Sequence, residues 1–125
     1  MEYDKTLYEA TVYDDSRKYY IDLKQGSDKY VKISEVSRGK RATMMVDLQY
    51  LHMFTSKLMV AESGDKVGTL DAGNKSYDFH LEAAETGSRV VVTLNSIKKF
   101  KVYLTMESIP EITKKLVDIK RKFEE

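Results

Sequence analysis

Basic and aromatic residues alternate with apolar ones along residues 17–36, RKYYIDLKQGSDKYVKISEV. The apolar residues take odd-numbered positions, and the even-numbered positions carry Lys18, Tyr20, Lys24, Tyr30 and Lys32. Side chains two residues apart in a β-strand point to the same face, and Gln-Gly-Ser-Asp between the two runs has the composition of a turn. The pattern therefore predicts a β-hairpin with one apolar and one polar face. Ammonium groups pair with phosphates and phenol rings stack on unpaired bases, so the polar face has chemistry suited to single-stranded nucleic acid.

The charge of the chain is concentrated in this region. The net charge is +1, but residues 17–41 contain eight basic and three acidic residues. Arg38, Lys40 and Arg41 follow the hairpin closely and could extend a phosphate-binding path. An alternative interpretation is an ordinary exposed strand face, since lysine is common on such faces and tyrosine favours strands.

Other chemistries lack the residues that they need. Cysteine is absent, and His52 and His80 lie in different halves without clustered partners, so we expect no disulfide and no metal site. The sequence contains no Gly-rich phosphate loop and no catalytic triad order. We therefore expect no enzyme activity, no catalytic residue, no cofactor and no small-molecule substrate.

Apolar runs are too short for a membrane span of about 20 residues, and the N-terminus has no signal-peptide stretch. We expect no membrane partner and an intracellular location, in the nucleus, cytoplasm or nucleoid.

The periodicity of the 125 residues predicts one α+β domain. Alternating segments predict strands, and apolar residues at i, i+3 and i+7 predict a helix from Leu51 onward and another over residues 109–123. The expected strands cover residues 8–12, 17–25, 29–36, 42–48, 67–71, 77–81, 89–95 and 100–106.

The two halves have matching apolar patterns. A shift of 58 residues superimposes the patterns of a hairpin strand, of the strand before the helix and of the helix itself; for example, Tyr19 maps to Tyr77 and Phe54 to Ile112. The match predicts a duplicated ββββα unit, with repeat one over about 3–63 and repeat two over about 64–125. Pairing two such units would cover the apolar face that each leaves open.

The segments KYYIDLKQ and KYVKISEV resemble the PUR repeat of the purine-rich-element binding proteins of the Pur-alpha type. That repeat begins with a strand of the form K-R-F-Y-L-D-V-K, followed by a turn and by R-F-L-K-I-x-E-V. The resemblance implies two ββββα PUR repeats intertwined into one Whirly-like domain. It also implies binding of single-stranded, purine-rich DNA or RNA.

The resemblance assigns binding roles to individual positions of the first repeat. Lys18, Tyr20 and Lys24 match the binding strand, Gln25 continues its Lys-Gln pair, and Lys29-Tyr30 replaces an Arg-Phe pair. Asp28 stands in a turn that is usually basic in the family.

The second repeat matches less well. Asp78 and Glu82 replace Tyr20 and Lys24, and its basic residues form a separate patch of Lys98, Lys99 and Lys101. Whether this repeat binds or is chiefly structural stays open.

Two functions are consistent with these patterns. The first is non-enzymatic binding of single-stranded DNA or RNA through a basic and aromatic sheet face. The alternative is a protein-interaction or dimerisation module on the same fold, which includes a homodimer of the chain.

Overall fold

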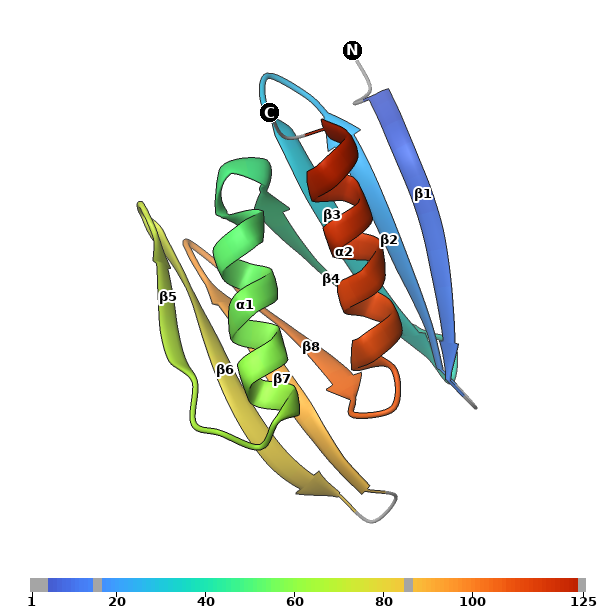
Figure 1. Cartoon of the computed structure of the whole chain (residues 1–125), viewed down its shortest axis with the longest axis vertical. Helices are drawn as coiled ribbons and strands as arrows, with labels where there is room; N and C mark the ends of the chain where they lie inside the picture. The colour runs from blue at the N-terminus through green and yellow to red at the C-terminus, as the bar shows by residue number, and fades with distance from the viewer. Residues whose placement is uncertain (1–4, 15–16, 85–86, 124–125) are drawn as a thin grey trace.

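The computed structural model describes residues 5–14, 17–84 and 87–123, which form two four-stranded antiparallel sheets and two helices (Figure 1). Sheet A has the order β1-β2-β3-β4, and sheet B has the order β5-β6-β7-β8. The predicted α+β class and the ββββα order of each half are confirmed. The elements are β1 (Lys5–Asp14), β2 (Arg17–Gln25), β3 (Lys29–Ser37), β4 (Lys40–Asp47), the 3₁₀ turn η1 (Leu48–Tyr50), α1 (Leu51–Glu62), β5 (Gly68–Ala72), β6 (Lys75–Ala84), β7 (Gly87–Asn95), β8 (Lys99–Thr105) and α2 (Ile109–Phe123).

Each helix covers the sheet of the other repeat. In α1, the ring of Phe54 packs on Tyr77 and Phe79 of β6, with ring centroids 5.5 and 5.3 Å apart. In α2, the ring of Phe123 contacts Tyr8 of β1 at 6.4 Å. Figure 1 shows α2 across β2 and β3 and α1 across sheet B, and the two helices contact each other between the sheets. The repeats are therefore intertwined, and one apolar core contains residues from both.

Two buried tyrosines join the repeats in equivalent ways. The Tyr19 hydroxyl donates to the carbonyl oxygen of Tyr103 at 2.9 Å, and the Tyr77 hydroxyl donates to that of Met45 at 2.6 Å. Both donors and both acceptors are related by the shift that relates the two sequence halves. The halves are thus packed with approximate two-fold symmetry, in agreement with an internal duplication.

The helical stripes predicted from the sequence occupy equivalent buried positions. Leu51, Phe54 and Leu58 of α1 have no exposed surface. The corresponding residues of α2, Ile109, Ile112 and Leu116, are equally buried.

The shift of 58 residues does not hold for the third strand of each repeat. Ile21 pairs with Ile33 in sheet A, whereas the equivalent Phe79 pairs with Val92 in sheet B. Between these paired residues, the chain from Phe79 to Val92 is one residue longer than the chain from Ile21 to Ile33. The chain from Val92 to its partner Val102 in β8 is one residue shorter than the chain from Ile33 to its partner Met44 in β4. The two changes cancel, so the shift returns to its first value in β8.

Candidate nucleic-acid interface

The even-numbered basic and aromatic residues of β2 and β3 lie on one face of sheet A. Lys24 pairs directly with Tyr30 and Asp22 with Lys32, so the polar positions of the two strands coincide. The intervening odd-numbered residues of β2 are fully buried in the core under α2. We call the opposite side of the sheet the outer face; it carries Lys18, Tyr20, Lys24, Tyr30 and Lys32.

The edge strands β1 and β4 add cations and rings to the outer face. The Arg41 guanidinium lies 5.4 Å from the centre of the Tyr20 ring, and the Lys18 ammonium lies 5.7 Å from that of Tyr13. Tyr13 is 71% exposed and pairs with Lys18 across β1 and β2. Tyr13 is not among the binding residues expected from the sequence. Its position next to the buried Val12, in a strand that alternates, was the signal that could have found it.

Acidic groups reduce the positive potential of the outer face. Asp22 lies between Glu9 of β1 and Lys32 of β3 in the sheet, and Lys24 is the next residue of β2 on the same face. Partial burial raises the pKa of the Asp22 carboxyl, and the charge of Glu9 raises that pKa further. Lys24, Lys32 and Arg41 oppose this shift. The net upward shift means that the surrounding cations do not fully compensate Asp22.

Gln25 and Lys29 do not join the outer face. They pair with each other at the end of the β2–β3 hairpin, at odd-numbered positions that belong to the core side of the sheet. Lys29 instead borders a cavity of about 440 Å³ together with Asp28 and Asp47. The two carboxylates outnumber the one ammonium group, so this cavity does not attract an anion.

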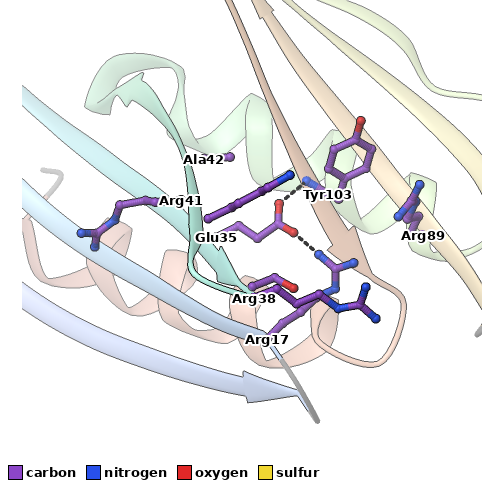
Figure 2. A pocket seen from close by; sticks show the side chains of 9 residues that line it. Arg17, Glu35, Arg38, Arg41, Ala42, Arg89 and Tyr103 are labelled. Atoms are coloured by element: carbon purple, nitrogen blue, oxygen red, sulfur yellow. Dashed lines mark hydrogen bonds and ion pairs between the residues drawn. The ribbon is translucent and has the colours of Figure 1, made fainter.

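At the opposite end of β3, Arg38 lies in the two-residue turn into β4, and Lys40 is the first residue of β4. They line a cavity of about 520 Å³, together with Arg17, Arg41 and Arg89 (Figure 2). The single acidic residue in its lining is Glu35, which is 5% exposed. We call this space the arginine cavity. Arg89 comes from repeat two and had no role in the expectations from the sequence.

Glu35 links the two sheets at the arginine cavity. Its carboxylate accepts a hydrogen bond from the backbone N–H of Tyr103 in β8 at 2.8 Å and pairs with the Arg17 guanidinium. Figure 2 shows both contacts. A buried carboxylate is stable only when it is paired and hydrogen-bonded, and Glu35 meets both conditions.

The corresponding surface of sheet B has a different character. The Asp78 carboxylate accepts hydrogen bonds from Thr69 at 2.7 Å and from Asn95 at 2.8 Å, and Glu82 pairs with Arg89. The carboxylates of Asp78 and Glu82 are therefore held by partners within sheet B.

The secondary basic patch of repeat two lies along β8 and the turn before it. Lys99 and Lys101 pair with Asn95 and Thr93 of β7, and Lys98 stands in the turn. The patch is separate from the arginine cavity, whose lining does not include it.

No protein-family model matches the chain, and no curated protein matches it. Across residues 5–14, 17–84 and 87–123, no group of three or more His, Cys, Asp or Glu residues is placed to hold a metal ion. Within the same residues, no helix is long and apolar enough to cross a membrane.

Proposed function

We propose that the protein binds single-stranded DNA or RNA, without enzymatic activity, through the outer face of sheet A. We further propose that the intertwined ββββα repeats form a PUR-type, Whirly-like domain that favours purine-rich strands. The main support is the placement of cations and tyrosine rings together on the face of sheet A opposite α2, whereas sheet B carries Asp78 and Glu82 at the positions that correspond to Tyr20 and Lys24.

On the outer face, the lysines and the tyrosines have different roles in the proposed binding. Lys18, Lys24 and Lys32 provide charges for the phosphates of a strand, and each contact releases condensed counterions. Tyr13, Tyr20 and Tyr30 provide planar surfaces, and stacking of one base on such a surface contributes about 1–3 kcal/mol. Duplex DNA hides its bases in the stack, so this face should prefer single strands.

We expect the two kinds of residue to have separable effects on binding. Replacing Tyr20 and Tyr30 with alanine should weaken binding of a purine-rich single strand by about tenfold or more, with an unchanged salt slope. Replacing Lys18, Lys24 and Lys32 with glutamine should weaken binding and flatten the dependence of log affinity on log salt by up to about 0.7 per lost phosphate contact. Fluorescence anisotropy at several salt concentrations measures both effects.

A charge-matched control uses lysines that do not lie on the outer face of sheet A. Lys66 follows α1, and Lys114 and Lys115 lie on α2. Changing these three to glutamine removes the same charge and should change affinity by less than about twofold. If both outer-face variants remain folded and bind like the parent at every salt concentration, the proposal is wrong.

The alternative function, an interaction module, relies on the exposed side of α1. Met53, Met59 and Val60 are 44%, 52% and 42% exposed there. The equivalent positions of α2 are Glu111, Val117 and Asp118. Under this alternative, oligonucleotide binding would be absent or independent of the outer-face lysines, so the same titration separates the two functions.

A further inference from the structure

The arginine cavity has a strong positive charge that the fold of the protein does not require. It lies where repeat one meets repeat two, between the turn that joins β3 to β4 and the strands β7 and β8. Two of its cations are neutralised: Arg17 by Glu35, and Arg89 by Glu82. Among the residues that the structure describes, neither Arg38 nor Lys40 forms an ion pair. Arg41 forms no ion pair among these residues either, but its guanidinium lies over the Tyr20 ring. Arg38 and Lys40 are therefore left to attract an anion into the cavity.

The paired arginines are held in fixed orientations at the cavity wall. The Arg89 guanidinium lies 4.4 Å from the centre of the Tyr103 ring and bonds Glu82 through two of its nitrogens. Arg17 is held by the buried Glu35. A guanidinium has five N–H donors, so each retains donors beyond those used in its pair.

The backbone at Arg38 supplies an independent observation. Ser37 pairs with Lys40, so Arg38 and Gly39 form a two-residue hairpin turn with φ angles of 53° and 76°. Such turns favour Asn-Gly or Gly-Gly, because positive φ is unfavourable for a residue with a long side chain. Within the described residues, Arg38 is the one non-glycine residue with a positive φ. An arginine at this position is explained by a use for its side chain rather than by the turn.

Arg41 connects the cavity with the outer face of sheet A. It borders the cavity, but Figure 2 shows its guanidinium directed away from Glu35, and this group lies over the Tyr20 ring. A nucleic-acid strand that stacked on Tyr20 and followed β2 and β3 toward Arg41 would therefore end beside the arginine cavity.

We propose that the arginine cavity binds the terminal phosphate of a single-stranded oligonucleotide whose bases lie on the outer face. This proposal rests on the proposed function. A phosphomonoester carries about −1.5 to −2 charges at pH 7, given a second pKa of about 6, whereas an internal phosphodiester carries one. The two uncompensated cations match the dianion, and forked arginines contact phosphate oxygens through paired N–H groups.

The test compares one purine-rich oligonucleotide with a 5′-phosphate, a 3′-phosphate or hydroxyls at both ends. We expect one phosphorylated form to bind about tenfold tighter than the hydroxyl form at pH 7.5. The advantage should shrink below pH 6, where the phosphate loses its second charge. Equal affinity of all three forms for the parent protein would overturn the proposal.

The variant Arg38→Asn with Lys40→Gln should abolish this advantage, so that all three forms bind it with equal affinity. Because two cations near the phosphate path are lost, the hydroxyl form should also bind more weakly, but by less than the phosphorylated form does. Asparagine is favoured at this turn, so we expect an unchanged or higher melting temperature. The outer-face lysine variant should weaken binding of all three oligonucleotide forms and keep the ratio of their affinities. The control variant at Lys66, Lys114 and Lys115 should change neither the affinities nor their ratio. Loss of the advantage in that control would also count against the cavity.

A direct probe separates this proposal from the proposed function. Inorganic pyrophosphate should shift the amide NMR signals of residues 39 and 40 in the parent protein but not in the double variant. If no oligonucleotide binds while pyrophosphate produces these shifts, the cavity remains an anion site and the proposed function is wrong. If oligonucleotides bind and pyrophosphate produces no shift, the assignment of the cavity is wrong.

Discussion

Asp22 is an acidic residue in the middle of the outer face and opposes its positive charge. Its carboxyl is partly buried, lies near Glu9 and has a raised pKa. A raised pKa in the folded protein means that the ionised form is less favourable there than in the unfolded chain. The contribution of the protonated Asp22 carboxyl to stability is therefore complete below the usual pKa of about 3.9. It is lost as the pH rises through the pKa that Asp22 has in the folded protein.

We expect Asp22→Asn to strengthen single-strand binding several-fold at pH 7, because it removes an anion from the phosphate path. A bound phosphate raises the pKa of Asp22 further, so the parent should gain affinity as pH falls toward that pKa. The difference between parent and variant should therefore shrink with decreasing pH, as parallel anisotropy titrations would measure. A variant that binds more weakly than the parent at pH 7 would contradict this role for Asp22.

At the scale of elements, side chains from sheet A satisfy the backbone of β8. The Tyr19 hydroxyl donates to the Tyr103 carbonyl and accepts from the Thr105 N–H at 3.2 Å, and Glu35 accepts from the Tyr103 N–H. The opposite junction has the bond from Tyr77 to Met45. Unpaired backbone groups are costly when buried, so these side chains make the contact between the sheets specific.

We expect Tyr19→Phe to cost more stability than Tyr77→Phe. Loss of one such hydrogen bond costs about 0.5–1.5 kcal/mol, and Tyr19 makes two of them with β8. Urea denaturation of both variants and of the parent measures the difference. Both variants keep the buried ring and lose only the hydroxyl, so a larger cost for Tyr77→Phe would contradict the role assigned to the two bonds of Tyr19.

The same tyrosines predict how stability responds to alkaline pH. Burial raises the pKa of both hydroxyls, so their contribution is full below the usual value of about 10 and declines as pH rises above it. Each phenylalanine variant should therefore lose less stability between pH 9 and 11 than the parent does.

At the scale of the whole molecule, the exchange of helices makes the two repeats interdependent. The helix that covers sheet A belongs to repeat two, so repeat one alone would expose the apolar side of its own sheet. The four fully buried aliphatic residues of α2 are Ile109, Ile112, Leu116 and Ile119.

Removing residues 108–125 should therefore unfold both sheets together. Burial of each of the four side chains contributes about 1.5–3 kcal/mol, and a typical domain is stable by only about 5–15 kcal/mol. Circular dichroism and thermal melting would show loss of the cooperative transition. A truncated chain that melts near the parent temperature would mean that the sheets are stable without the exchange.

Much of this fold could be predicted because its elements have clear hydrophobic periods. Alternation along β2 and β3 determined the faces of sheet A, since a shift by one residue would expose Ile21 and Ile33. The repeated pattern indicated that two ββββα units pair, and it placed Tyr20, Tyr30 and the lysines on one surface. These properties are local or depend on one regular shift, so the sequence contains them directly.

Only the tertiary structure decided which elements meet. The exchange of α1 and α2, the hydrogen bonds from Tyr19 and Tyr77, and the pairing of Arg17 with Glu35 depend on how sheets pack, which periodicity does not encode. The arginine cavity combines Arg38 with Arg89, which lie 51 residues apart in different repeats. Its charge arises because burial of two apolar sheet faces brings polar residues of both repeats to the same junction, and no short sequence pattern specifies such a meeting.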